Sequence, residues 1–254
     1  MIHFIQSLPV SQGVPLVIAA GVLLSMLGTF VAAALFTPEE LIANNAVGGF
    51  KFAFLAQIVA ALLAFALVDS ATRFVSFQFR CDRELAAISL MQRLEAFLPA
   101  DAARLHEAQT AYIKNVVDDE WLAMQQGRGS EGATKALEDW YSKAMAALPR
   151  TDQERLAQSQ YMRLFSEVVN NRTGRISDST SPFENLIWLS MSIAVMITIT
   201  FNWFFGSYSL ATQLLMGALL TAGVMMLVYL AVVLASPIHS PIGILPTDYA
   251  ALLH

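Results

Sequence analysis

The sequence predicts an all-α membrane protein with four transmembrane helices in two hairpins and a helical polar region between the second and third spans. Of its 254 residues, 56% are hydrophobic and 14% are charged, whereas about a quarter of the residues in a typical soluble domain are charged. The two outer thirds of the chain carry few charges, which are Glu39, Glu40, Lys51, Glu184 and Asp248. All other charged residues lie in the central third, so a polar segment separates two apolar ones.

Composition and motifs exclude several classes of protein. The net charge of -5 is mild and both signs mix in the central third, so we expect no basic face for nucleic acid. Cys81 is the only cysteine, which excludes an intrachain disulfide and a thiolate metal cage within one chain. The four histidines are scattered, and no HExxH, phosphate-loop or GxSxG motif is present. We therefore expect no enzyme, no catalytic residues, no metal and no cofactor.

Four apolar stretches are long enough to cross about 30 Å of hydrocarbon, which takes roughly 20 helical residues. The first has no Lys or Arg before it and is too long for the core of a signal peptide, so it is expected to be a retained span. Short connections join the first span to the second and the third to the fourth, which predicts two helical hairpins. The expected spans are about Val14 to Phe36, Val47 to Val68, Phe183 to Phe205 and Ala211 to Ala235.

Helix-start signals support these boundaries. Thr37 to Glu40 and Ser181 to Glu184 each combine an N-cap hydroxyl, a proline at the first helical position and a glutamate three residues after the cap. The first capping box predicts a short surface helix that leads into the second span. The second predicts the start of the third span.

The central third is predicted to be helical throughout, because no strand pattern interrupts it. The helix of the second span is expected to run on through Ser70 to Leu98, where Pro99 stops it. A third capping box opens the last of these helices, and "NNRTGRISDSTSP" (Asn170 to Pro182) is expected to be a loop. The remaining helices are expected over about Asp101 to Gln126, Glu131 to Leu148 and Thr151 to Arg172. The resulting divisions are an N-terminal hairpin (1–68), a central helical region (69–182), a C-terminal hairpin (183–235) and a tail (236–254).

Basic residues that flank the spans predict the orientation, because Lys and Arg are retained on the cytoplasmic side. Arg73, Arg80 and Arg83 follow the second span, and Arg172 and Arg175 precede the third. The loop of the first hairpin carries no basic residue. The central region and both termini are therefore expected in the cytoplasm.

Helical periodicity divides the second span into two lines of side chains, at 100° per residue. One line lies within roughly 40° of a single direction, and it consists of Lys51, Leu55, Ile58, Leu62, Phe65 and Asp69, followed by Arg73. The other line lies about 120° away, and it consists of Gly49, Ala53, Gln57, Ala60 and Ala64. Small residues let membrane helices approach closely and a glutamine can hydrogen-bond across the contact, so the second line predicts a helix-packing face.

The first line can form the wall of a pore. Lys51 would attract anions at the outer mouth, four apolar side chains would form a narrow neck that gates by dewetting, and Asp69 with Arg73 would form a charged inner mouth. Two other interpretations stay open. Lys51 lies about 5 Å from the interface, a distance that an extended lysine side chain can snorkel. An apolar stripe can also face lipid or the core of a helix bundle.

Three groups in the central third are candidates for a site, and a structural interpretation is favoured for each. His106 with Glu107 is expected to be a solvated surface pair. The run Asp118 to Glu120 is expected on a solvated face, because consecutive helix positions point in different directions and cannot alone form a cation site. The aromatic residues expected to pack in a core are Trp121, Trp140 and Tyr141.

Several short motifs follow one another along the chain in a characteristic order. They are Asn44-Asn45-Ala46-Val47-Gly48-Gly49, Glu84-Leu85-Ala86, Tyr112, Glu120-Trp121, Arg172 to Arg175, Trp188 and "SPIHSPIGILP" (Ser236 to Pro246). Taken together they resemble the bestrophin-like family of bacterial membrane proteins over nearly the whole chain. The resemblance implies a distant relation to bestrophins, which are homopentameric anion channels with four membrane helices, cytoplasmic termini and a helical cytoplasmic region.

In bestrophins the second helix lines the pore, and the resemblance carries the neck over to Leu55, Ile58, Leu62 and Phe65. Calcium-gated bestrophins have an acidic cluster after the last span, but residues 236–254 hold only Asp248, so calcium gating is in doubt. We expect a homo-oligomer, a pentamer by resemblance, that conducts small inorganic anions across the bacterial inner membrane.

Two other functions stay open. The first is a non-conducting membrane anchor or sensor whose central helices bind a partner, which the size of the polar third favours. The second is an enzyme, which lacks support because no catalytic set is visible. The proline-containing tail (236–254) can fold under the bundle or dock on a neighbouring subunit, and the sequence does not choose between these positions.

Overall fold

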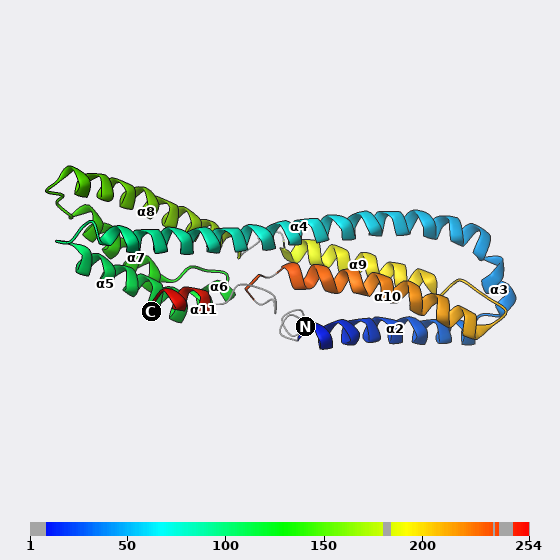
Figure 1. The fold of residues 1–254 in the computed structure, drawn as a ribbon. Coiled ribbons are helices and arrows are strands. Elements are labelled where there is room, and N and C mark those ends of the chain that lie inside the picture. Colours follow the sequence, from blue (N-terminus) through cyan, green and yellow to red (C-terminus); the bar gives the residue numbers. More distant parts are fainter. Residues whose placement is uncertain (1–8, 180–183, 236, 239–245, 254) are drawn as a thin grey trace. The chain divides into compact units, whose positions relative to one another are not determined.

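The computed structural model describes residues 9–179, 184–235, 237–238 and 246–253. Throughout these ranges the regular structure is helical, with no strand (Figure 1). The all-α prediction is therefore confirmed for the part of the chain that the structure describes.

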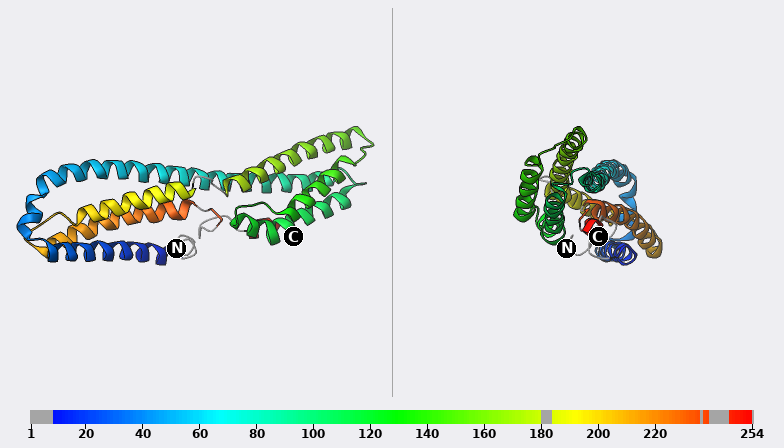
Figure 2. Two further views of the ribbon diagram at one scale, coloured as in Figure 1. Left: turned by 180° about the vertical axis from the view of Figure 1, so that it is seen from behind. Right: turned by 60° about the vertical axis from the view of Figure 1, so that its left-hand side comes forward.

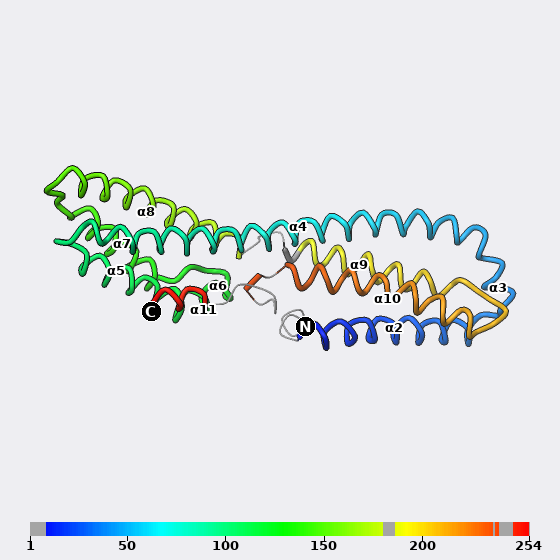
Figure 3. Tube along the Cα trace, in the orientation of Figure 1, coloured from blue at the N-terminus to red at the C-terminus, as the bar shows by residue number. Residues whose placement is uncertain are grey.

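The chain forms two compact units. The membrane unit comprises Met1–Thr72 and Pro182–Ser236, and the central unit comprises Arg73–Ser181 and Pro237–His254. One helix, α4 (Asn45–Glu95), is 51 residues long and contributes to both units. Figure 3 shows it as one continuous coil.

The membrane unit contains three helices in the described residues that are long and apolar enough to cross a membrane, namely α2, α4 and α10. The apolar part of α9, Leu186–Asn202, is shorter, at about 25 Å. The fourth span thus stays a prediction, and its expected cap, Ser181 to Glu184, begins outside the described residues. Besides α4, the helices of this unit are α2 (Val10–Leu35), α3 (Pro38–Ala43), α9 (Glu184–Asn202) and α10 (Leu210–Ala235).

The capping box at Thr37 is present as predicted. The Glu40 amide donates to Thr37 Oγ1 over 3.3 Å, and the Thr37 amide donates to Glu40 Oε2 over 2.8 Å. These two bonds satisfy backbone donors that the first turn of a helix leaves unpaired. The capping box therefore starts α3 after a break of two residues from the end of α2.

Helices α2 and α10 run side by side, because α2 presents small residues to its neighbour (Figure 1). A Cβ atom at Gly21 would overlap the Met225 side chain, and one at Gly28 would overlap the Trp203 ring. Ser25 Oγ also donates to the Gly217 carbonyl of α10, over 3.5 Å. The first span therefore carries a small-residue packing face that the sequence analysis did not identify.

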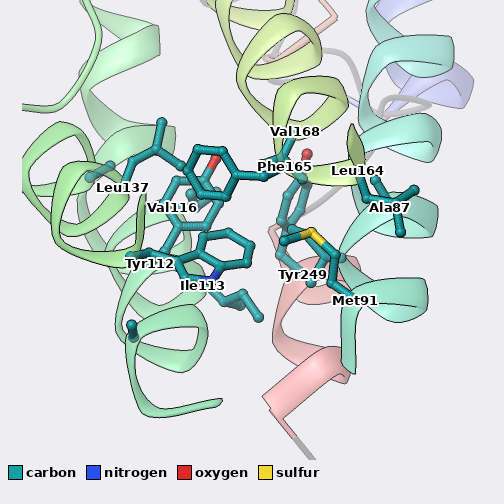
Figure 4. Close-up of a cluster of buried hydrophobic side chains, with 14 of the residues drawn as sticks. Ala87, Met91, Tyr112, Ile113, Val116, Leu137, Leu164, Phe165, Val168 and Tyr249 are labelled. Carbon is teal, nitrogen blue, oxygen red and sulfur yellow. The ribbon is translucent and has the colours of Figure 1, made fainter. Parts of the chain in front are cut away.

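The central unit packs its helices around one apolar core. Figure 4 shows Tyr249 in this cluster with Met91 of α4 and Phe165 of α8. Apart from the C-terminal part of α4, its helices are α5 (Ala102–Asn115), a π-helical turn (Val116–Glu120), α6 (Trp121–Gln125), α7 (Glu131–Met145), α8 (Asp152–Asp178) and α11 (Thr247–Ala250). Within this unit α5 and α8 contact α4, and α7 packs mainly on α5. Figure 2 shows the helices from further sides.

The prediction of a loop from Asn170 is wrong, because α8 continues to Asp178. The polar side chains of this stretch are satisfied within the helix: Asn171 Nδ2 donates to the Glu167 carbonyl over 2.8 Å, and Thr173 Oγ1 donates to the Val169 carbonyl over 2.9 Å. Polar residues that are typical of a loop are thus accommodated in this helix by bonds to its own backbone.

The third capping box differs in detail from the prediction. Thr151 Oγ1 accepts from the Glu154 amide over 3.1 Å, as expected of an N-cap. The Glu154 carboxylate, however, accepts from the Arg150 amide over 2.6 Å instead of returning to Thr151. The helix α8 begins at Asp152 all the same.

The end of the tail folds against its own chain. Tyr249 of α11 is fully buried in the core of the central unit, and Gln92 Nε2 of α4 donates to the Leu252 carbonyl over 3.1 Å. This settles the position of residues 246–253, while most of "SPIHSPIGILP" lies outside the described residues.

Candidate pore helix and charge cluster

Helix α4 packs one face on the rest of the membrane unit. Val59, Leu63 and Ala66 are buried on this face and contact side chains of α9 and α10. At the same end as the hairpin loops, Phe52 stacks on Phe201, with ring centroids 5.8 Å apart. This packed face differs from both lines of side chains that the sequence analysis singled out.

The predicted neck residues lie mostly outside the intrachain core. Ile58, Leu62 and Phe65 have exposed fractions of 45%, 41% and 63%. Leu55 is half-buried and packs at the edge of the α4–α9 core. Three bulky apolar side chains in a row thus lack cover from the described part of their own chain.

The predicted small-residue face is also uncovered within the chain. Ala53, Gln57, Ala60 and Ala64 are exposed, and Gly49 has open space where a Cβ atom would stand. A contact through this face therefore requires another molecule, such as a second copy of the chain or lipid.

The predicted mouth charges lie on the same helix. Lys51 is exposed, and Asp69 and Arg73 are half-buried. About five turns of helix separate Lys51 from Asp69, which corresponds to roughly 27 Å along the axis. The spacing agrees with the thickness of the hydrocarbon core.

The central unit holds a buried charge cluster of Glu84, Glu120, Arg172 and Arg175. Arg175 Nε lies 2.9 Å from Glu84 Oε2, and Arg175 Nη2 lies 2.7 Å from Glu120 Oε1. Arg172 Nε donates to Glu120 Oε2 over 3.0 Å. Two positive and two negative charges balance, which is the condition for burying ions at acceptable cost.

Two tyrosines complete the charge cluster. Tyr112 donates to Glu84 Oε1 over 2.5 Å, and Tyr249 donates to Glu84 Oε2 over 2.9 Å. The Arg175 guanidinium also lies 5.3 Å from the centre of the Tyr249 ring. The contacts of Glu84, Glu120 and Arg175 thereby connect five elements of the central unit, which are α4, the π-helical turn, α5, α8 and α11.

Burial shifts the pKa values of the charge cluster in a consistent way. Desolvation, with the negative charge of Glu84, raises the pKa of Tyr112 well above its usual value, so its hydroxyl stays a donor. Burial alone would lower the pKa of Arg175, but Glu84, Tyr249 and Glu120 raise it well above its usual value. Tyr112 therefore stays protonated and Arg175 stays charged at neutral pH.

Several predictions about the central third need correction. Glu120 was expected on a solvated face but is fully buried, because the π-helical turn ends at this residue and its carboxylate meets two arginines. His106 is exposed as expected, yet it lies 3.1 Å from the buried Glu95 rather than forming only a surface pair. Trp121 and Trp140 are buried in the core as predicted, whereas Tyr141 is exposed.

The sequence contained a signal for the charge cluster that was not used. Arg172 and Arg175 stand three residues apart, so they share one face of a helix if the segment is helical. In the predicted loop, the same arginines serve only as charges that flank the third span. A second ion pair involves the same helix: Arg80 Nε contacts Asp178 Oδ2 over 2.6 Å, and a Cβ atom at Gly174 would overlap this guanidinium in its present position.

Other chemistry is sparse in the described residues. No group of three or more His, Cys, Asp or Glu side chains is arranged to hold a metal ion in that part of the chain. Burial raises the pKa of the Cys81 thiol to about 12. The thiol is therefore a poor nucleophile at neutral pH.

These features define a helical membrane protein with a long shared helix and a buried charge cluster in its central unit. A family model described as the Bestrophin-like domain matches residues 19–249. The chain belongs to the Bestrophin-like family. Residues of the charge cluster, Glu84, Tyr112, Glu120 and Arg172 to Arg175, are among the motifs on which the resemblance was based.

Solved structures share this fold. Two variants of a bacterial Bestrophin homolog from Klebsiella pneumoniae have TM-scores of 0.66 and 0.69, are each 16% identical, and match 93% of this chain and 96% and 94% of theirs. Another crystal structure, of a membrane protein variant, has a TM-score of 0.69 at 16% identity, with 93% and 95% covered. At this identity the likeness concerns the fold. No curated protein matches the chain.

Proposed function

We propose that this chain is the subunit of a homo-oligomeric, pentameric channel that conducts small anions through a pore lined by α4. The observation that carries the proposal is the uncovered row of Ile58, Leu62 and Phe65, which runs beside an equally uncovered row of small residues. In a ring of subunits, the first row faces the axis as a narrow apolar neck and the second seats against a neighbour.

The charges at the two ends of the neck support anion conduction. Lys51 stands before the neck and is exposed, so it raises the local concentration of anions at that mouth. Asp69 and Arg73 follow the neck and bring both signs to the other mouth. Orientation with the central unit and both termini in the cytoplasm of a bacterial cell places Lys51 on the outer side of the inner membrane.

Self-association has further support in the central part of α4. Val75, Phe79 and Leu90 are exposed on the helix face opposite the core, although this unit is otherwise rich in polar residues. Their spacing of four and eleven residues keeps them on one side of a helix. Such an apolar stripe is typical of a protein interface.

Planar bilayers with the purified oligomer test conduction directly. Currents are expected whose reversal potential follows the chloride gradient, and Ile58→Ala and Phe65→Ala should raise the conductance because they widen the neck. Leu219→Ala, at an exposed position of α10, is the matched control and should leave the conductance unchanged. Silence from a correctly assembled oligomer, or cation selectivity, contradicts the proposal, and unchanged currents in both neck variants move the pore away from this face.

The alternative is a non-conducting anchor or sensor whose central helices bind a partner. The observation that favours it is a set of exposed apolar side chains near the connection from α7 to α8, which are Tyr141, Met145, Leu148 and Leu156. A monomer or dimer by native mass in mild detergent supports this function, because four helices in one subunit enclose no aqueous path. A pentamer with chloride currents rules out the anchor or sensor as the main function.

A further inference from the structure

An apolar groove of about 350 Å³ runs through the membrane unit between α2 and α9, with α10 as the third wall. It exists because α2 packs along α10 and contacts α9 over only a short stretch. Its interior is lined by buried side chains that include Trp188, Ile199 and Tyr229. Ala20 and Ser192 stand exposed on its rim, so the groove is open on one side.

Water is a poor occupant of this groove. A buried water needs two to four polar partners, and the polar side-chain groups in the lining are the Ser192 hydroxyl on the rim, the Tyr229 hydroxyl and the Trp188 indole N–H. A hydrocarbon chain, in contrast, needs only apolar contacts. Met191, Met196 and Met225 add flexible, polarisable side chains that adapt to a chain of irregular shape.

The dimensions match one leaflet of a bilayer. The lining spans Trp188 to Ile199 on α9, or about 16 Å along the helix axis, and half of the hydrocarbon core is about 15 Å thick. On α10 the lining residues, Met225 to Val232, belong to the last half of the helix, the end that the basic flanking residues place toward the cytoplasm. On α9 the lining begins in the first half and continues past the middle of the helix.

We infer that the groove binds one acyl chain of a phospholipid from the inner leaflet. No residue of α4 lines the groove, so the chain lies outside the proposed pore and is reached from the lipid. The occupant is the ordinary hydrocarbon of the membrane, held in a fixed place by three helices.

The bound chain also supports α4 through α9. Trp188, Met191 and Val195 line the groove and belong at the same time to the buried cluster that contains Val59 and Leu63 of α4. Filling the groove therefore limits the movement of α9 against the helix that carries the neck. This consequence for conduction rests on the proposed channel function, whereas the binding of the acyl chain does not.

Ala20→Phe tests the binding, because a phenyl ring at the rim fills the groove from α2. Ala19→Phe is the matched control, since Ala19 is exposed on the same helix but does not line the groove. Native mass spectrometry after mild delipidation should find about one phospholipid per chain in the wild type and in Ala19→Phe, and at least about tenfold less in Ala20→Phe. Equal retention in all three proteins, or no retention in the wild type, overturns the inference.

A second variant and a second measurement make the test independent of one substitution. Ser192→Phe fills the groove from α9 and should lose the lipid as Ala20→Phe does. Phospholipids with brominated acyl chains should quench Trp188 emission in the wild type, measured as the part of the quenching that Trp188→Phe removes, and this part should vanish in both filled variants. Quenching that persists in the filled variants contradicts the assignment. Retained lipid without chloride currents would refute the channel alone, and currents without retained lipid would refute the groove alone.

Discussion

Replacing Arg175 with methionine should destabilise the central unit far more than a change at its surface. Arg175 is the ion-pair partner of Glu84, and Arg172 bonds to Glu120 instead. The substitution therefore leaves the fully buried Glu84 carboxylate with tyrosine hydroxyls but no cation. Removing one partner of a buried ion pair typically costs about 3–5 kcal/mol of stability.

The expected change in melting temperature is large enough to measure. For a chain of this size, 1 kcal/mol shifts Tm by about 2–4 °C, so Arg175→Met should lower Tm by roughly 6–20 °C. Tryptophan emission during heating in detergent reports on the central unit, because Trp121 and Trp140 are buried in its core. Arg163→Met on the same helix is the control, since this arginine is exposed and its ion pair with Glu167 is long, at 3.9 Å.

A double variant separates the loss of charge balance from the loss of packing. Glu84→Gln in the Arg175→Met background removes the uncompensated charge and should recover at least about half of the lost Tm. A single variant that melts within about 2 °C of the wild type, or a double variant no more stable than the single one, would refute the idea that charge balance holds this core together.

Three further changes should act on the central unit, each followed by thermal unfolding. Gly174→Ala should cost about 1–3 kcal/mol, because the new Cβ atom displaces the Arg80 guanidinium; an unchanged Tm would show that this guanidinium moves aside freely. Tyr249→Phe should cost about 1.5–3 kcal/mol through its lost hydrogen bond to a charged group, and no loss would mean that the tail is held by apolar contact alone. Burial raises the pKa of the Glu95 carboxyl above its ordinary 4.5, and the nearby His106 partly opposes this rise. The contribution of Glu95 to the free energy of unfolding is therefore present at acid pH and is lost as the pH rises above 4.5. Glu95→Gln should therefore gain Tm relative to the wild type from pH 4.5 to neutral pH, and a constant difference would contradict this.

The membrane helices were predictable because their signal is composition over a long stretch. About 20 apolar residues in a row need a bilayer whatever their neighbours are, and α2 and α10 begin and end within a few residues of the expected bounds. The capping box at Thr37 was predictable for a related reason, since all of its partners lie within four residues.

The charge cluster was harder to predict because its partners are far apart in sequence. Glu84 and Arg175 are separated by 91 residues and Glu84 and Tyr249 by 165 residues, and no local pattern records such pairing. The stretch after Asn170 has the residues of a loop, yet its arginines supply enough tertiary energy to keep it helical. Tertiary contacts overrode local propensity there.

Periodicity groups the residues of α4 into faces, but it does not say what each face contacts. The structure shows that Val59, Leu63 and Ala66 pack within the chain, which the sequence could not distinguish from the rows on either side. All three faces are apolar or small, so hydrophobicity alone does not separate contact with α9 from contact with lipid or a second subunit.

Tyr249 reaches Glu84 across a sequence separation of 165 residues. Residues 73–179 precede α9 and α10 in the chain, and Tyr249 follows both helices. During synthesis, the buried acid of the central unit therefore gains this hydrogen-bond donor only after both of these helices have been made.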